Sequence, residues 1–397
     1  MKRQENRIAF QGGAYSLAIT AVVLAILVVI NVLAGSLPSS LMKYDISSSK
    51  LYSITSNTKV VVNALDQDVN IYWIVQSGKE DSVLDNLLSK YASLSDHIQV
   101  IKKNPDVYPT FAKQYTDETV QNNSLVVECG DKNRFISYDD IYLQDSNPYS
   151  YTYNTSFDGE GAITSAIDYV VSDELPQMYV LEGHGETELP ETFKDQLEKE
   201  NVETHSFSLL NEDQIPEDAD VIMIYGPTSD ISVEEETMLA SYVAGGGKLL
   251  VMAGPTKEGT LTNLCGLLND YGVTASDGII VEGDRTHYAF QTPYVLLPDI
   301  EQNDMTDSLI QANYFVIMPL SQGLTVSGYS SSGTVTSLLT TSESAFSKTA
   351  GYSLDTYEKE DGDVDGPFST AISIDAENGG QIVWFGSSMF LVDTYNA

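Results

Sequence analysis

The stretch DADVIMIYGPTSDISVEEETMLASYVAGGGKLLVMAGP, residues 218–255, decides the fold class of the second half of this chain. Apolar runs at Val221–Tyr225 and Lys248–Met252 predict buried strands, and Ser232–Ala244 between them predicts a helix. Gly245-Gly246-Gly247 ends that helix and turns into the second strand. Near-continuous apolar strands joined by a helix are typical of a parallel sheet covered on both faces.

Similar patterns extend this sheet in both directions. Helices are predicted at Thr192–Glu200 and Leu261–Tyr271, and residues 321–349 indicate ordered loop and edge strand. We therefore expect residues 176–397 to form one α/β domain. Its further strands are predicted at Gln177–Leu181, Glu203–Phe207, Tyr314–Met318, Ala371–Ile374 and Gln381–Phe385.

Residues 43–157 show a different order of elements: strand, helix, strand, helix, strand, strand. This order resembles a thioredoxin-like domain. Where a redox Cys-x-x-Cys would follow the first strand, the chain has Gln76-Ser77-Gly78-Lys79, so the resemblance implies a domain without redox cysteines. Residues 158–175, with a helix at Gly161–Val171, are expected to connect the two domains. The strands are predicted at Val69–Val75, Ile98–Lys102, Ser124–Cys129 and Arg134–Ser137, and the helices from Ser56 or Asn57, at Glu80–Leu94 and at Pro109–Tyr115.

The apolar segment Ala14–Gly35 predicts a transmembrane helix. At about 1.5 Å per residue it spans about 33 Å, enough for a bilayer core of about 30 Å. The alternative is a cleavable signal peptide, since Val32-Leu33-Ala34 has the small-x-small pattern of a cleavage site, but the apolar part of such peptides has about 7 to 15 residues.

Basic residues precede this segment, and they set its expected orientation. Lys2, Arg3 and Arg7 are opposed only by Glu5. The positive-inside rule therefore places residues 1–13 in the cytoplasm and the bulk of the chain outside the cell membrane, in a single-pass arrangement.

Composition excludes several classes of function. The 397 residues carry 57 acidic against 20 basic side chains, a formal charge of −37, which excludes a nucleic-acid-binding surface. Two cysteines, Cys129 and Cys265, and four histidines are too few for a disulfide framework or a thiolate zinc site, and they also argue against heme and iron–sulfur centres. We expect no cofactor.

Five ordered motifs, with the segment YDISSSKLYSITSNTK after the membrane helix, resemble the GldG-type family of auxiliary components of ABC transport systems. One departure is Ser387, where the closing Phe-Gly-Asp-Ser motif of relatives often has an acidic residue. The motifs are DGEGAITSAIDYV (residues 158–170), YVLEGHGETEL (179–189), the opening stretch 218–255, SLLTTSESAFSKT (337–349), and GPFSTAISI with GQIVWFGSSMF.

The resemblance implies an extracytoplasmic protein that acts with a separate ATPase and permease. Together with the predicted membrane helix and the missing catalytic groups, it leads us to expect a non-enzymatic, membrane-anchored accessory subunit of an ABC transporter. It also implies that the second domain is similar to the class I glutamine-amidotransferase-like (flavodoxin-like) fold. The catalytic groups of such a fold are absent, because Ala253-Gly254-Pro255-Thr256 stands where a nucleophile elbow would follow a strand. Cys265 falls within a helical apolar pattern, and Gly245-Gly246-Gly247 lacks the spacing of a phosphate-binding loop.

The best candidate site is Gly183-His184-Gly185-Glu186 with the preceding Glu182. It follows a buried strand, so it should lie at the carboxyl edge of the sheet, where open α/β folds bind ligands. The glycines allow close backbone approach, and the histidine and carboxylates could bind a metal or a cationic group. The structural alternative is a tight turn with Glu186 near a helix N-terminus, and a lone histidine without a nucleophile favours this alternative.

A second candidate is the loop EKEDGDVDGPF, in which Asp361, Asp363 and Asp365 match the opening of a calcium loop. The match fails at the bidentate glutamate position, which falls on Ile372, so a solvated acidic loop is the favoured interpretation. Two other functions remain open at this point: an extracytoplasmic ligand- or calcium-binding protein, and a hydrolase with an unconventional site.

Overall fold

A computed structural model describes residues 54–147, 152–210, 214–327, 330 and 332–392. The predicted membrane helix Ala14–Gly35 and the basic residues before it lie outside the described residues. Within the described part of the chain, no helix is both long and apolar enough to cross a bilayer.

The chain has a mixed α/β fold with more sheet than helix, and it divides into two compact units near Pro176. Each unit has its own buried apolar core. Each unit contains one of the two tryptophans: Trp73 is buried in the first unit and Trp384 in the second.

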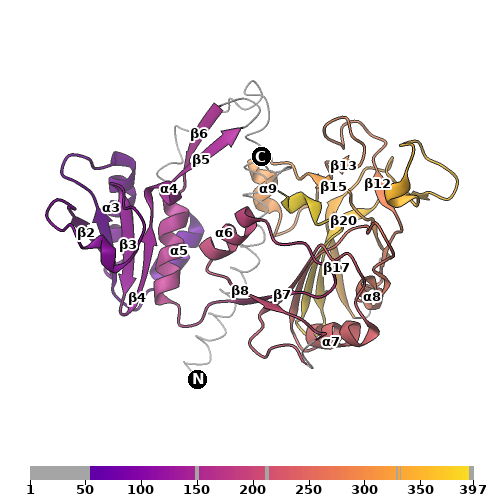
Figure 1. The fold of residues 1–397 in the computed structure, drawn as a ribbon, viewed down its shortest axis with the longest axis horizontal. Coiled ribbons are helices and arrows are strands. Elements are labelled where there is room, and N and C mark those ends of the chain that lie inside the picture. Colours follow the sequence, from indigo (N-terminus) through magenta and orange to yellow (C-terminus); the bar gives the residue numbers. More distant parts are fainter. Residues whose placement is uncertain (1–53, 148–151, 211–213, 328–329, 331, 393–397) are drawn as a thin grey trace. The chain divides into compact units, whose positions relative to one another are not determined.

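A four-stranded sheet of order β2-β1-β3-β4 forms the centre of the first unit (Figure 1). β1 pairs with β2 in parallel and with β3 antiparallel, so the helix α3 makes the crossover between two parallel strands. The elements are α2 (Ser56–Asn63), β1 (Val69–Ile74), α3 (Ser82–Leu94), β2 (Ile98–Lys103), β3 (Ser124–Cys129), β4 (Lys132–Ile136), α4 (Tyr138–Ile141), β5 (Tyr142–Asn147), β6 (Thr152–Phe157) and α5 (Gly159–Val171).

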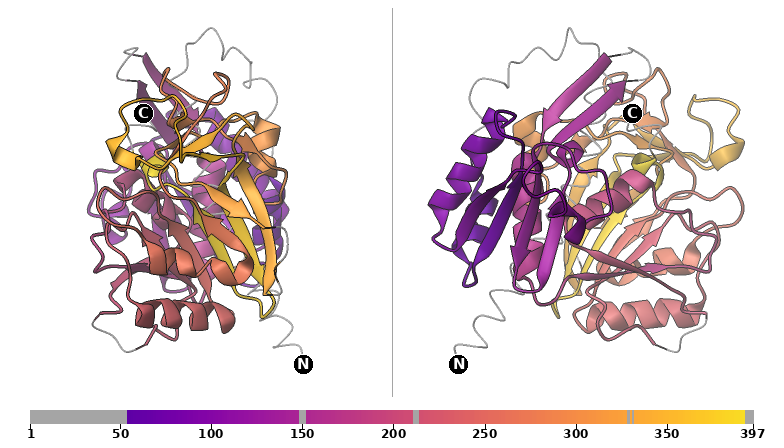
Figure 2. Two further views of the ribbon diagram at one scale, coloured as in Figure 1. Left: turned by 90° about the vertical axis from the view of Figure 1, so that its right-hand side faces the viewer. Right: turned by 60° about the vertical axis from the view of Figure 1, so that its left-hand side comes forward.

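α5 is part of the first unit's core, although the sequence suggested a connecting helix. Its side chains Ile163, Ala166, Ile167 and Val170 are buried in the same cluster as those of α3 and the sheet. The expected helix at Pro109–Tyr115 is only a 3₁₀ turn, Ala112–Gln114. The antiparallel hairpin β5–β6, which the sequence did not suggest, extends away from the sheet (Figures 1 and 2).

The second unit is built on five parallel strands in the order β8-β7-β9-β10-β21. The strands are β7 (Gln177–Leu181), β8 (Glu203–Phe207), β9 (Val221–Tyr225), β10 (Lys248–Met252) and β21 (Gln381–Phe385), and the helices are α6 (Glu191–Lys199), α7 (Val233–Ala244), α8 (Thr262–Gly266) and α9 (Asp307–Ala312).

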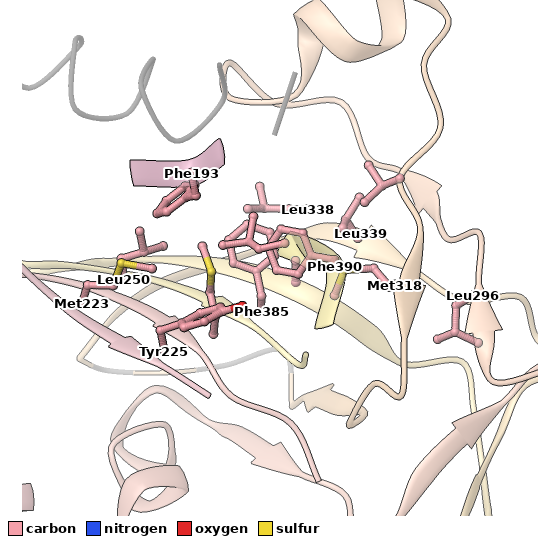
Figure 3. Packing of buried hydrophobic residues seen from close by; sticks show 14 of the residues in the cluster. Phe193, Met223, Tyr225, Leu250, Leu296, Met318, Leu338, Leu339, Phe385 and Phe390 are labelled. Atoms are coloured by element: carbon pink, nitrogen blue, oxygen red, sulfur yellow. The ribbon is translucent and has the colours of Figure 1, made fainter. Parts of the chain in front are cut away.

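Neighbouring residues of β10 belong to two different cores, as the alternation of side chains along a strand requires. Leu250 and Met252 face the cluster that includes Phe193 of α6. Leu249 and Val251 face the cluster that includes residues of α7 and α8, which lie together in Figure 1. Helices therefore cover both faces of the sheet. In the first of these cores the rings of Phe385 and Phe390 pack with centroids 4.8 Å apart (Figure 3).

Beyond β21 the sheet is mixed, which corrects the expectation of a wholly parallel sheet. β20 (Ser369–Ala376) pairs antiparallel with β21. The predicted strand at Tyr314–Met318 is only the two-residue β15 (Met318–Pro319), which pairs with β13 (Val295–Leu296) outside this sheet. The remaining strands are β11 (Val273–Ala275), β12 (Ile279–Val281), β13 (Val295–Leu296), β14 (Asp299–Ile300), β15 (Met318–Pro319), β16 (Leu324–Val326), β17 (Gly333–Thr340), β18 (Phe346–Lys348), β19 (Val364–Asp365) and β20 (Ser369–Ala376).

Candidate functional site

The Gly-His-Gly-Glu turn begins one residue beyond the end of β7 and lies at the carboxyl edge of the parallel strands. Gly183 and Gly185 have φ angles of 126° and 73°. A Cβ atom on Gly185 would lie 2.2 Å from Oγ1 of Thr228, and one on Gly183 would lie 2.9 Å from Leu210. Both the left-handed backbone and the close neighbours therefore require glycine at these two positions.

The Glu186 side chain stabilises the turn through hydrogen bonds to other residues of the same turn. Its Oε2 accepts hydrogen bonds from the backbone N–H groups of Gly183, at 2.9 Å, and His184, at 2.7 Å. Its Oε1 lies 3.1 Å from Nδ1 of His184. The carboxylate therefore satisfies donors of its own turn, five residues before α6 begins, and it is not a charge at that helix's N-terminus as the sequence suggested.

The other ring nitrogen of His184 faces a carboxylate that comes from 51 residues further along the chain. Nε2 lies 3.2 Å from Oε2 and 3.1 Å from Oε1 of Glu235, with the better hydrogen-bond geometry toward Oε2. The side chains of His184, Glu186 and Glu235 are only 5%, 7% and 3% exposed. A neutral imidazole has one N–H, so both contacts are hydrogen bonds only when the ring carries both protons.

Glu235 is fixed by a capping box at the start of α7. Its backbone N–H donates to Oγ of Ser232 at 3.2 Å, and its Oε2 accepts from the N–H of Ser232 at 2.7 Å. Burial acts to raise the pKa of Glu235, but the hydrogen bonds from Ser232 and the contact with His184 outweigh burial and hold this pKa below its ordinary value.

The backbone of His184 also ties the turn to the loop after β9. Its carbonyl accepts from the N–H groups of Thr228, at 3.0 Å, and Ser229, at 2.9 Å. Together with the two carboxylates, these bonds join the ends of β7 and β9 to the first turn of α7. We call His184, Glu186 and Glu235 the histidine staple.

Four of the five predicted site residues thus belong to one assembly, and Glu182 does not. Glu182 is exposed and accepts a hydrogen bond from Ser206 of β8.

Sequence reasoning missed Glu235, although the pattern Ser232-x-x-Glu235 ahead of an apolar run was a readable capping-box signal. Both ring nitrogens of His184 lie within 3.2 Å of carboxylate oxygens. Across the described ranges, no group of three or more His, Cys, Asp or Glu side chains could hold a metal ion.

The structure does not bring Asp361, Asp363 and Asp365 together around a common point. Asp363 accepts from the N–H groups of Glu360 and Thr349 and lies 3.2 Å from Nζ of the fully buried Lys348. Asp365 pairs with Lys359, and Asp361 is exposed. A calcium loop instead turns its carboxylates inward onto one ion.

The buried Lys348 holds this acidic loop onto β18. Its ammonium group donates to Oε2 of Glu360 at 2.6 Å and to the carbonyl of Glu358 at 2.8 Å. The hydrogen bond to Glu360 raises the pKa of Lys348 above its ordinary value. For Asp363, burial acts to raise the pKa, but the N–H of Glu360 and the charge of Lys348 outweigh it and bring the pKa below its ordinary value.

Neither cysteine is prepared to act as a nucleophile. Burial, followed by the charges of Asp230 and Asp277, raises the pKa of Cys265 to about 12. Burial also raises the pKa of Cys129. Both thiols therefore stay protonated at neutral pH, whereas a reactive cysteine needs its thiolate form.

Comparison with known proteins identifies the second unit. Residues 175–371 match the model of a family described as an ABC-type uncharacterized transport system. This region belongs to that transport-auxiliary family. The GldG-type resemblance is thereby confirmed, and the chain has an accessory role in an ABC-type transport system.

The remaining comparisons concern the first unit and the fold. Residues 48–144 match a domain of unknown function, DUF7088. No curated protein matches the chain. Among solved structures, one titled mmIFT52 N-terminal domain is similar over 55% of this chain and 89% of its own, with 17% sequence identity and a TM-score of 0.41.

Ser387, the departure from the family's closing motif, has a local structural role. It is 1% exposed, its hydroxyl donates to the carbonyl of Pro319 at 2.6 Å, and the same oxygen accepts from the N–H of Met389 at 3.0 Å. An ionised carboxylate could not make the first of these bonds, because it has no hydrogen to donate.

Proposed function

We propose that this chain is a non-enzymatic, membrane-anchored extracytoplasmic subunit of an ABC transporter that works with a separate ATPase and permease. The observation that carries the proposal is the match of residues 175–371 to the transport-auxiliary family. ATP hydrolysis belongs to the partner chain in this proposal. Gly245 and Gly246 support that division of labour, because they form the C-terminal cap and turn of α7 and do not cradle a phosphate.

The non-enzymatic part of the proposal is supported by the places where catalytic groups would stand. After β10 comes Ala253, which is 1% exposed, followed by Gly254. A Cβ atom on Gly254 would lie 3.0 Å from the carbonyl oxygen of Gly386, so the backbone of the neighbouring strand end fills the position that a nucleophile elbow needs. His184, which could serve as a base elsewhere, is buried between two carboxylates.

The finer fold assignments form part of the same proposal. The order β8-β7-β9-β10-β21 corresponds to the flavodoxin-like order 2-1-3-4-5, which supports a class I amidotransferase-like second unit. The β1-α3-β2 crossover followed by the antiparallel strands β3 and β4 and the helix α5 supports a thioredoxin-like first unit. Its loop Gln76–Lys79 contains no cysteine.

The membrane anchor is proposed from the sequence alone. Ala14–Gly35 is long and apolar enough to span a bilayer, and the basic residues before it favour a cytoplasmic N-terminus. With this topology both compact units work outside the membrane, where they can contact the outer loops of a permease but not a cytoplasmic ATPase.

Genetic epistasis tests this function without knowledge of the transported substrate. The gene for this chain, and each ABC permease gene of the same organism, would be deleted singly and in pairs. We expect one permease deletion to reproduce the growth and sensitivity profile of the deletion of this chain, with no further defect in the double deletion. Additive defects with every permease would contradict the proposal.

A further inference from the structure

A pocket of about 290 Å³ opens in the second unit at the edge of the sheet opposite the histidine staple. It lies where α7 ends and β21 begins, at the amino ends of the parallel strands. Buried side chains of Val243, Leu267 and Ile382 contribute an apolar floor. Its volume is near the lower end of the range for ligand pockets, so it suits a small molecule or a single side chain.

Negative and polar groups surround the mouth of this pocket. Asp270 and Glu377 are exposed carboxylates that line it, and neither side chain has a hydrogen-bond or ion-pair partner within the described part of the chain. Tyr271 lies beside Asp270, and burial, followed by the charge of Asp270, raises the pKa of Tyr271. Its hydroxyl therefore stays protonated at neutral pH and can both donate and accept.

The end of α7 adds a third source of negative potential. Helix carbonyl groups point out of the C-terminal end and favour a cation there, and the last turn of α7 contains no basic residue to meet them. The β20–β21 turn packs directly on this end, since a Cβ atom on Gly380 would lie 2.0 Å from the carbonyl oxygen of Val243. The turn is itself closed by hydrogen bonds from the N–H of Ala376 to the carbonyl of Gly380 and from the N–H of Gly379 to the carbonyl of Ala376, so the wall of the pocket is well defined.

We propose that this pocket binds an alkyl cation, with the aliphatic part on the Val243, Leu267 and Ile382 floor and an ammonium or guanidinium group at the rim between Asp270 and Glu377. An apolar floor alone would suit a neutral ligand, and a carboxylate pair alone would suit any cation. The combination selects a molecule that has both parts. A free aliphatic amine and a lysine or arginine side chain of a partner protein share this chemistry.

Equilibrium dialysis of the full chain in a neutral detergent tests the proposal, with butylamine and butylguanidine as probes. Butanol and butyrate have the same aliphatic chain without the positive charge. Salt near physiological strength suppresses the general accumulation of cations around a protein of charge −37. We expect saturable binding of the two cations at one site and none of butanol or butyrate at the same concentrations.

Matched variants locate the binding. Asp270→Asn with Glu377→Gln removes the two rim charges at nearly constant shape and should weaken binding of butylamine at least about tenfold, which is about 1.4 kcal/mol. Asp304→Asn with Glu258→Gln removes two exposed charges elsewhere and should leave binding unchanged. Ala240→Leu keeps every charge but narrows the pocket from the exposed side of α7, and it should also weaken binding.

A peptide-like probe separates the two sources of the cation. N-acetyl-lysine methylamide that binds at least as tightly as butylamine would assign the pocket to a partner's side chain, and weaker binding would assign it to a free amine. Binding of butylamine that is equal in the rim variant and in its control, or equal to that of butanol, would overturn the proposal. Unchanged unfolding temperatures of all variants show that the loss of binding is not a loss of fold.

Discussion

His184 lies between two buried carboxylates, so its removal should affect stability more than the loss of a buried ring would. His184→Ala leaves the buried carboxylates of Glu186 and Glu235 without the ring that both contact. A buried hydrogen-bonding group that loses its partner commonly costs about 1–3 kcal/mol, and more when the group is charged. We expect a loss of this size in the free energy of unfolding of the second unit.

Tryptophan fluorescence measures that loss unit by unit. In a Trp73→Phe background, Trp384 reports on the second unit alone, because the chain contains no other tryptophan. The control is His205→Ala on β8 of the same unit, whose exposed imidazole contacts Gln177 and should contribute less than about 1 kcal/mol. If His184→Ala were as mild as this control, the histidine staple would not stabilise the second unit.

Asp158 makes the stability of the first unit depend on pH. It precedes α5 without a side-chain capping bond, and burial, followed by the charges of Glu160 and Asp140, raises its pKa from 3.8 to about 6. Between these values the folded chain keeps a proton that the unfolded chain has lost, so this carboxyl lowers stability progressively as the pH rises from about 4 to about 6.

Asp158→Asn should therefore stabilise the first unit at neutral pH. The gain has an upper bound of about 3 kcal/mol, the equivalent of a two-unit shift in pKa. It should vanish near pH 4, because the native carboxyl is then largely protonated in the folded state. Denaturant unfolding at several pH values, followed through Trp73 in a Trp384→Phe background, measures the difference; a difference independent of pH would contradict this account.

At the residue scale, the sequence predicts interactions between residues that are close together in the chain. It recognised that Gly183-His184-Gly185-Glu186 forms a turn at the end of a strand, because glycine and carboxylate preferences act over a few residues. It could not reach Glu235, since the contact to His184 depends on how β7 and α7 are placed by the intervening strands. The same limit applies to the acidic loop. Its carboxylates contact Lys348, which lies on β18, and the sequence alone did not indicate that this lysine is their partner.

Among the secondary-structure elements, α2, α3 and α5 of the first unit meet around a small buried polar network. Oγ1 of Thr164 lies 2.9 Å from Oγ1 of Thr58 and 2.6 Å from the hydroxyl of Tyr91. Glu160, one turn earlier on α5, accepts from the N–H and hydroxyl groups at the start of α2. Thr55 and Thr58, from the end of the family-like segment before α2, thus contact the motif at residues 158–170.

Thr164→Val removes the hydroxyl that contacts both Thr58 and Tyr91, and the new side chain has nearly the same shape. The hydroxyls of Thr58 and Tyr91 then each lose one partner but keep a hydrogen bond to Glu160, so the stability of the first unit should fall by about 1 kcal/mol. Thr164→Ser is the matched control, because it retains the hydroxyl and should keep most of the stability. The Trp73 signal measures both variants, and equal stability of Val and Ser at this position would show that the network does not join the helices.

The elements that could be predicted are those with enough length to show a period. β1, β3, β7, β9, β10, α3 and α7 were found within a few residues, since each has a clear apolar pattern. The two- and three-residue strands β11 to β15 carry no such pattern. The direction of β20 could not be predicted either, because parallel and antiparallel strands can have the same apolar pattern.

For the molecule as a whole, the proposed anchor makes a prediction about topology. Protease added to intact cells should degrade the chain and leave a small fragment that contains Ala14–Gly35, because only that segment and the residues before it would be shielded by the membrane. A cytoplasmic protein should stay intact until the cells are permeabilised. Full protection of this chain in intact cells would contradict an extracytoplasmic location.

The measurement that tests the central claim most directly is quantitative affinity purification of the tagged full chain from membranes dissolved in a mild detergent. The account predicts that one ABC permease and its ATPase are recovered in amounts comparable to the chain. It further predicts that deletion of the permease also removes the ATPase, because the chain lies outside the membrane and the ATPase inside. Recovery of the chain without any permease, or of the ATPase in the absence of the permease, would contradict an accessory subunit of this kind.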